Sequence, residues 1–283
     1  MPPEPQQRGT SFGFTAWRGQ TSAMTAPHAH NDIEVNFCAA PVTYESAGGS
    51  YTVPGGVPAA FWGSRPHQLV DISESEPHAF VTIPLARFMS WAVPAPATRR
   101  LLQGFILVGP DDEPWEGLPS AFDRWARDLF ERREVPMRAT ALEVEALLLR
   151  MILGEWAATT TDRARSTLDL QRAAAMATYL AENLTTDVRV KDVATAVHLS
   201  PNRAAAIFRR IFGIGILRYL AQLRVSEAQR LLLTSDLTSE AVGARAGFGS
   251  ASSFHETFLG ECGTSPLRWR EAHRNPAGPA PVG

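Results

Sequence analysis

The segment from Thr185 to Arg274 constrains the fold of this 283-residue chain most, because a helix-turn-helix pattern occurs in it twice. The first copy has a short apolar helix over Val190–Val197 and a turn that ends at Ser200. A serine here caps a helix because its hydroxyl accepts a hydrogen bond from a free backbone amide of the first turn. Pro201 fits the first helical position, because an N–H group there makes no hydrogen bond within the helix. A second helix therefore begins at Pro201.

This second helix has one apolar and one polar face. Its apolar residues recur at i, i+3, i+4 and i+7, which indicates a buried stripe; they are Ala204, Ile207, Phe208 and Ile211. Short and basic side chains on the other face suit entry into a DNA major groove, with arginines for phosphates or guanine edges. The exposed residues are Asn202, Arg203, Ala205, Ala206, Arg209 and Arg210, and all but Ala205 are predicted DNA contacts.

The second copy repeats this arrangement. A short helix over Ser239–Arg245 meets a glycine-bearing turn at Ala246–Gly249, and a helix over Ser250–Phe258 follows. Phe254 and Phe258 are spaced for burial on one face of that helix. The predicted DNA contacts on its other face are Ser250, Ser252, Ser253 and His255.

The helix predicted over Ile216–Leu233 joins the two units. Its apolar residues are expected to contact both units and to fix their spacing; they are Leu217, Leu220, Leu223, Ala228, Leu231 and Leu232. Two rigidly spaced helices of this kind read two short blocks about one turn of DNA apart.

These residues together resemble the DNA-binding domain of the AraC/XylS family of bacterial transcription regulators. The match is carried by Leu199-Ser-Pro201, Phe208-Arg-Arg-x-Phe-Gly213, Tyr219-Leu220, Leu223-Arg224, Ala246-Gly-Phe248, Ser253-Phe254, Gly263-x-Ser-Pro266 and Trp269-Arg270. The chain departs from the family at Ala206, often basic or polar there, and at Leu259 and Gly260, where lysines or arginines are usual. Glu256 adds a negative charge to the exposed face, so we expect the first unit to dominate DNA affinity.

The resemblance implies a cytoplasmic regulator, an activator as most of the family are, that binds promoter operator DNA as a homodimer and contacts RNA polymerase. The charge distribution agrees with a DNA partner: Thr185–Arg274 carries 12 Lys and Arg against 8 Asp and Glu, whereas the whole chain has a net charge of -2. No apolar run reaches the length of a membrane span, so no membrane partner is expected.

Residues 12–109 have the sequence pattern of a β domain. Short apolar segments alternate with turns, which favours a small barrel or jelly roll; the expected strands are Ile33–Ala39, Val42–Glu45, Ser50–Val53, Ala59–Gly63, His67–Ile72, His78–Ile83 and Phe105–Gly109. The order resembles the cupin-like sensory domain of sugar-responsive members of the same family. A short helix is expected over Pro84–Trp91. The predicted fold class is therefore α+β, with a cupin-like β-barrel before an all-α tandem helix-turn-helix domain.

A helical hairpin is predicted next, over Pro119–Arg133 and Met137–Trp156, with Pro136 interrupting it. A stripe on the second helix either packs on the barrel or forms a dimer face, and both can hold; it comprises Leu142, Glu145, Leu149, Ile152 and Trp156, with Leu148 and Met151 beside it. The expected division is a disordered tail at 1–10, a sensing barrel at 11–110, the hairpin at 118–158, a linker at 159–166, the DNA-binding domain at 167–274 and a tail at 275–283, with Asp169–Asn183 as that domain's first helix.

The motif His28-x-His30-x-x-x-Glu34, followed by His67, could carry chemistry. Side chains at i and i+2 of a strand point the same way, so these groups can converge. Three histidines and one carboxylate match the metal signature of enzymatic cupins, but polar lining of an effector pocket is the favoured interpretation. Trp62 is then expected to pack on the apolar face of a sugar ring.

Neither a catalytic residue nor a cofactor is expected. Two other classes stay open: a metal-dependent cupin enzyme fused to a DNA-binding domain, and a regulator that has no ligand. The two cysteines, Cys38 and Cys262, are far apart in the sequence and lack a metal-binding spacing, which predicts buried thiols.

Overall fold

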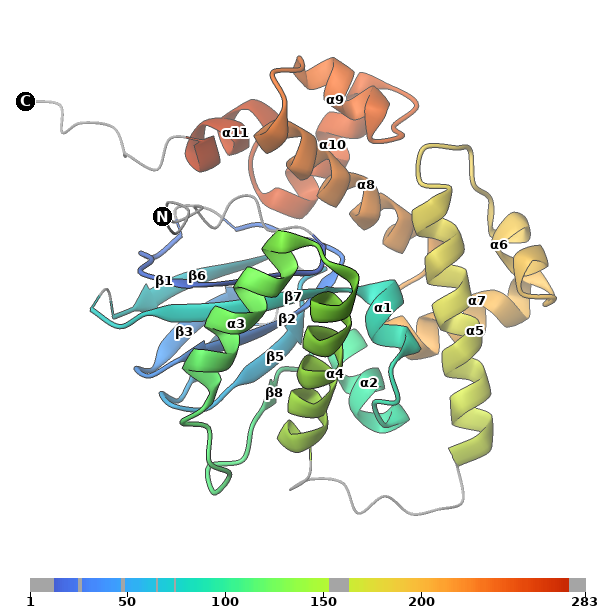
Figure 1. Cartoon of the computed structure of the whole chain (residues 1–283). Helices are drawn as coiled ribbons and strands as arrows, with labels where there is room; N and C mark the ends of the chain where they lie inside the picture. The colour runs from blue at the N-terminus through green and yellow to red at the C-terminus, as the bar shows by residue number, and fades with distance from the viewer. Residues whose placement is uncertain are drawn as a thin grey trace, which may run out of the picture.

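The computed structural model describes residues 13–24, 27–46, 49–64, 66–73, 75–152 and 163–274. We call residues 13–152 the N-terminal region and 163–274 the C-terminal region (Figure 1). The strands are β1 Thr15–Gly19, β2 Asp32–Cys38, β3 Val42–Ser46, β4 Gly49–Val53, β5 Ala59–Trp62, β6 His67–Ile72, β7 His78–Pro84 and β8 Leu107–Val108. The helices are α1 Leu85–Ser90, α2 Ala95–Leu102, α3 Leu118–Glu131, α4 Glu134–Met151, α5 Arg163–Glu182, α6 Val190–Ala196, α7 Pro201–Phe212, α8 Ile216–Thr234, α9 Ser239–Arg245, α10 Ala251–Cys262 and α11 Pro266–Arg274.

The strands form two antiparallel sheets. One has the order β1-β7-β2-β5-β8, and the other has the order β4-β3-β6. The prediction of a closed barrel is wrong for the described residues, because no ladder joins the outer strands of one sheet to those of the other. A backbone bridge between His28 and His67, and a bond of 2.8 Å from the Met24 amide to the Leu69 carbonyl, tie β6 to the chain that precedes β2. The predicted strand positions agree with the structure to within two residues, but β1 and α2 were not predicted.

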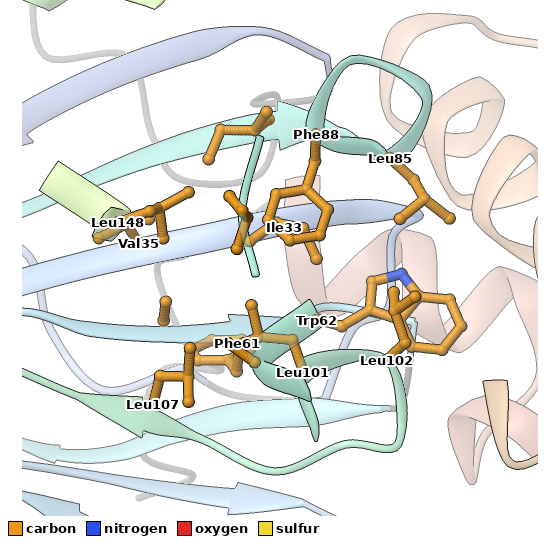
Figure 2. Packing of buried hydrophobic residues seen from close by; sticks show 14 of the residues in the cluster. Ile33, Val35, Phe61, Trp62, Leu85, Phe88, Leu101, Leu102, Leu107 and Leu148 are labelled. Carbon is orange, nitrogen blue, oxygen red and sulfur yellow. The ribbon is translucent and has the colours of Figure 1, made fainter. Parts of the chain in front are cut away.

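Strand β2 is buried along its whole length because it is flanked by β5 and β7. Its Ile33 and Val35 belong to a core that also contains Phe88 of α1, Leu101 of α2 and side chains of β5 and α4 (Figure 2). Helices α1 and α2 thus cover this part of the sheet and also pack against α5, with α2 reaching α7. The two regions are therefore joined through α1 and α2.

The hairpin of α3 and α4 packs on the N-terminal region, with α3 against β1. Its buried stripe agrees with the predicted one only in part: Ile152 is buried as predicted, but Leu142 is 60% exposed, and Ala141 and Val144 are buried in its place. The small Ala141 made the true stripe less apparent in the sequence. Pro136 does not interrupt the hairpin either, because it lies in the first turn of α4, where a proline costs little. Trp156 lies outside the described residues.

The C-terminal region consists of α5 to α11, and the predicted helices of both helix-turn-helix units are present. Helix α5 begins at Arg163, so residues 163–166 of the predicted linker are helical, in keeping with the strong helix propensity of arginine and alanine. The other linker residues, 159–162, and the predicted tails at 1–10 and 275–283 lie outside the described residues.

Helix α8 contributes to two separate hydrophobic cores. Ile216, Tyr219, Leu220 and Leu223 belong to the large core that includes the sheets, α5 and α7. From Val225 onward the buried residues belong to a second core with α9, α10 and α11. Leu217 was predicted to be buried but is 54% exposed.

Both cysteines are buried thiols, as predicted, and neither forms a disulfide. Burial raises the pKa of Cys262 to about 12, which keeps this thiol protonated. None of the described helices is long and apolar enough to cross a lipid bilayer.

Candidate functional site

Four side chains from two parts of the N-terminal region meet in one cluster. His28, His30, Glu34 and His67 each offer one ligand atom, and these atoms lie within 4.8 Å of one another. We call these residues the histidine cluster. The backbones of His28 and His67 exchange two hydrogen bonds, of 3.0 and 2.9 Å, and this pairing brings the rings within 4.3 Å between centroids. The structure therefore brings together all four residues that the sequence motif singled out.

Glu34 is the centre of the cluster. Its Oε2 lies 3.0 Å from Nε2 of His30 and 3.7 Å from Nε2 of His67. Burial opposes ionisation of Glu34, but the contacts with the two histidines outweigh it and hold the pKa of this carboxyl well below its ordinary value. Burial and the neighbouring His67 lower the pKa of His28 well below that of a free histidine. The cluster thus contains an ionised carboxylate and, at His28, a neutral imidazole.

Gly63 makes room for His30. Its amide donates to the carbonyl of Asp32 at 2.9 Å, and its carbonyl accepts from the amide of His30 at 2.8 Å. A Cβ atom added at Gly63 would lie 2.4 Å from Cε1 of His30, closer than van der Waals contact permits. Sequence reasoning missed this residue, because a glycine in a loop gives no sign of which ring it approaches.

A pocket opens beside the histidine cluster, between the two sheets. Trp62 of β5 lines it from the five-stranded sheet, and His67 of β6 lines it from the three-stranded sheet together with the hydroxyl-bearing residues Tyr44, Ser46 and Tyr51. The remaining lining residues are Phe61, Gly104 and Ile106. Aromatic faces and hydroxyl groups in one pocket suit a small ligand that has both apolar and hydrogen-bonding surfaces.

The segment Pro27–Asn31 carries two of these histidines and also contacts the C-terminal region. The carbonyl of Pro27 accepts a bond of 3.1 Å from Nε1 of Trp269, and the amide of Ala29 donates to Oε1 of Gln229 at 3.2 Å. Oδ1 of Asn31 accepts from the Tyr219 hydroxyl at 2.9 Å.

Odd and even positions of Pro27–Asn31 therefore differ in their contacts. Positions 28 and 30 supply side chains to the histidine cluster, whereas positions 27, 29 and 31 bond the C-terminal region. The contacts at positions 27 and 29 are made by backbone atoms, and the contact at position 31 is made by the Asn31 side chain.

Two of the contacting residues also contact α7 and α10, the helices predicted to read DNA. Gln229 is fully buried in α8, and its Nε2 donates to Sγ of Cys262, the last residue of α10, at 3.2 Å. Tyr219 packs against Phe208 and Phe212 of α7, and Trp62 stacks on its ring at 5.9 Å. Sequence reasoning missed Gln229, although an amide in the apolar stripe of a helix is a signal of a specific buried contact.

The predicted DNA-reading residues are all exposed. Those on α7 are Asn202, Arg203, Ala206, Arg209 and Arg210, and those at α10 are Ser250, Ser252, Ser253 and His255. Arg210 forms an ion pair with the buried Asp169 of α5. The Ser250 hydroxyl caps α10 by accepting a bond of 3.2 Å from the amide of Ser253. Both residues thus also stabilise the C-terminal region.

The predicted turn and cap chemistry is confirmed in the first unit. Ser200 accepts a bond from the amide of Arg203 at 3.4 Å, and Pro201 opens α7. Ala204, Ile207, Phe208 and Ile211 are buried as predicted, and so are Phe254 and Phe258 in the second unit. The polar faces of α7 and α10 are consequently turned away from the cores.

Comparison with known proteins agrees with this geometry. Residues 193–272 match the family model of a helix-turn-helix domain. The melibiose operon regulatory protein of Escherichia coli K12 is 26% identical over 256 residues, which cover 88% of this chain and 84% of that protein. The arabinose operon regulatory protein of the same organism is 32% identical over 93 residues, or 32% of each chain.

A solved structure shares the overall fold. ToxT from Vibrio cholerae O395, which was crystallised with (E)-4-(8-methylnaphthalen-1-yl)but-3-enoic acid, matches with a TM-score of 0.60 and 12% identity. The match covers 93% of this chain and all of that one. It extends over both regions, and so their arrangement within one chain has a counterpart in a known protein.

Proposed function

We propose that this chain, an AraC-type DNA-binding transcription regulator that resembles the melibiose operon regulator, binds a small-molecule effector beside its histidine cluster and changes its DNA binding in response. The observation that carries the proposal is the alternation along Pro27–Asn31, because one short segment contacts both the cluster and the C-terminal region. An effector that moves His28 or His30 also moves the bonds to α8 and α11. The division into a sensing region at 11–110, a hairpin at 118–158 and a DNA-binding domain at 167–274 is part of this proposal.

We propose a sugar as the effector. The exposed ring of Tyr51 offers an aromatic face to the apolar face of a sugar ring, with the buried Trp62 behind it in the pocket lining, while the cluster and the pocket hydroxyls offer partners for its hydroxyl groups. The relatives that regulate melibiose and arabinose operons support this ligand class. The naphthyl-butenoic acid bound to ToxT represents the competing class, an apolar carboxylic acid. A thermal-shift comparison of α-galactosides, other sugars and fatty acids would separate the two.

Replacing His30 or Glu34 with alanine is expected to abolish the effector response and to leave operator binding intact. Both side chains lie in the cluster, whereas neither belongs to the exposed faces of α7 and α10. Reporter induction and operator affinity, measured on the same variants, test this. Glu116→Ala is the control, because this glutamate is exposed in the N-terminal region, outside both the cluster and the helix-turn-helix units. Normal induction in both cluster variants would show that the cluster takes no part in the effector response.

Arg203 and Arg210 are expected to differ in their effects on DNA binding. Arg203 lies in the first turn of α7, the part of a recognition helix that reaches base edges. Arg203→Ala should lower discrimination at one base position by about 1–3 kcal/mol. Arg210→Ala should weaken binding to all sequences alike, because Arg210 lies near the end of α7 and also holds Asp169. Gel-shift titrations on an operator and its single-base variants measure both effects, and unchanged affinity in both would refute the assignment.

We also propose a homodimer formed through the α3–α4 hairpin, with activation by contact with RNA polymerase. Phe130, Val135 and Leu142 are 64%, 78% and 60% exposed, so the hairpin offers large apolar side chains to a second copy. Sedimentation of the full chain tests the dimer. The two competing functions predict other results: a metal-dependent enzyme would turn over a substrate, and a ligand-independent regulator would give no thermal shift with any sugar or fatty acid.

A further inference from the structure

We propose that His28, His30, Glu34 and His67 form a binding site for one divalent first-row transition-metal ion, such as Zn²⁺, Fe²⁺ or Mn²⁺. The proposal goes beyond the regulatory function and is independent of it, because the site would bind metal whether or not a sugar is the effector. The donor set decides the class of ion: imidazole nitrogens favour transition metals, whereas Mg²⁺ and Ca²⁺ prefer sites made of oxygen alone.

The distances suit metal coordination after small side-chain rotations. Zinc bonds to nitrogen and oxygen are about 2.0–2.2 Å long, so ligand atoms around a tetrahedral ion are about 3.3–3.5 Å apart. Oε2 of Glu34 is already 3.0 Å from Nε2 of His30 and 3.7 Å from Nε2 of His67. The widest separation within the set is below 4.8 Å, so an ion would draw these atoms together by roughly 1.5 Å or less.

The surroundings also fit a metal centre. Metal-bound histidines commonly have their second ring nitrogen directed at a carboxylate, which fixes the ring and raises its basicity. Nε2 of His30 faces Glu34, and Nδ1 on the other side of the ring lies 3.6 Å from Oδ2 of Asp32. Gly63 provides the space that the same ring needs.

One atom of the cluster is otherwise unexplained. Nδ1 of His28 is buried and has no hydrogen-bond partner among the described residues. Leaving a buried polar atom without a partner costs about 1–3 kcal/mol. A metal ion bound by this ring, or by its other nitrogen with a reorientation of the ring, would offset that cost. Because His67 lines both the cluster and the pocket, an ion held here would lie beside any molecule in the pocket.

The test uses the full-length protein after treatment with a chelator. Co²⁺ and Zn²⁺ are titrated separately without DNA or sugar, and elemental analysis measures the bound metal. We expect one equivalent per chain and visible absorption bands from bound Co²⁺. Changing even an outer partner of a metal ligand costs about 10- to 100-fold in affinity, so His30→Gln and Glu34→Gln should each lose more than about 100-fold. His198→Asn should bind as the wild type does.

X-ray absorption of the wild-type Zn²⁺ complex supplies a readout that does not depend on the folding of a variant. Three imidazole ligands are expected. A folded wild-type protein that binds neither ion stoichiometrically would overturn the proposal, and so would fewer than three imidazoles, or cluster variants that bind as tightly as wild type. The metal titration contains neither DNA nor sugar, so its result is separate from the sugar test. If the protein binds one metal ion but shows no thermal shift with a sugar, only the sugar effector is refuted. If it responds to a sugar but binds no metal, only the metal site is refuted.

Discussion

Inserting one alanine after Arg224 is expected to remove the second helix-turn-helix unit from its DNA groove while the first stays bound. The insertion falls between Leu223 and Val225, where α8 passes from one hydrophobic core to the other. One extra residue rotates everything beyond it by about 100°. The lost contacts should weaken operator binding by at least about 1–3 kcal/mol, the value of one good base contact.

A DNA footprint of this variant measures the effect directly. Helix α8 has 19 residues and so spans about 28 Å, close to the 34 Å between successive major grooves, and DNA bending can supply the remainder. Protection is expected over the first block of the operator only. An alanine inserted between Asp111 and Asp112, in an exposed turn of the N-terminal region, is the control and should leave the footprint complete. A full footprint with undiminished affinity in the Arg224 insertion would show that α8 does not set the spacing.

Trp62→Ala is expected to lower the free energy of unfolding by about 3–5 kcal/mol, the usual cost of removing a large buried aromatic side chain. Trp62 is 3% exposed and packs on Phe212 and Tyr219, so the cavity would open between the two regions. The same change should uncouple operator binding from the effector. Figure 2 shows this side chain beside Leu102 at one end of the core.

Urea unfolding followed by circular dichroism measures the loss, with Trp17→Ala as the matched control. Trp17 is half-buried on the outer strand β1 and stacks on Phe80, away from the helices of the C-terminal region. Its replacement should cost less and leave the effector response in place. Equal losses in the two variants would contradict a special role for Trp62 in joining the regions.

The local elements of this fold could be predicted because the periodicity of the sequence determines them. The spacing of Ile207, Phe208 and Ile211 gave the buried face of α7, and the Ser-Pro pair gave its start. The division of the strands into two open sheets could not be predicted in the same way. Alternation determines which side chains point inward, but it does not determine whether the outer strands of the sheets pair with one another. The stripe on α4 was misplaced because Ala141, a small residue, belongs to the buried face and Leu142 does not.

The histidine cluster could be anticipated from its motif, but its surroundings could not. The i, i+2 spacing of His28 and His30 predicted that their side chains converge, and Glu34 belongs to the same short motif, although both histidines lie just before β2. The partners of the intervening residues come from positions about 190 to 240 residues away, such as Gln229 and Trp269. Contacts between segments so distant in sequence have no local signature.

The alternation along Pro27–Asn31 has a consequence for how proteins of this design can change their ligand. A deletion of one residue before His28 would exchange the two faces of the segment, turning the histidines toward α8. Substitutions at Ser46 and Tyr51 carry no such penalty, since both residues line the pocket from β3 and β4 and lie outside the shared segment. New ligand specificity is therefore most accessible to evolution, and to engineering, on β3 and β4, while the five residues of the shared segment resist insertion and deletion.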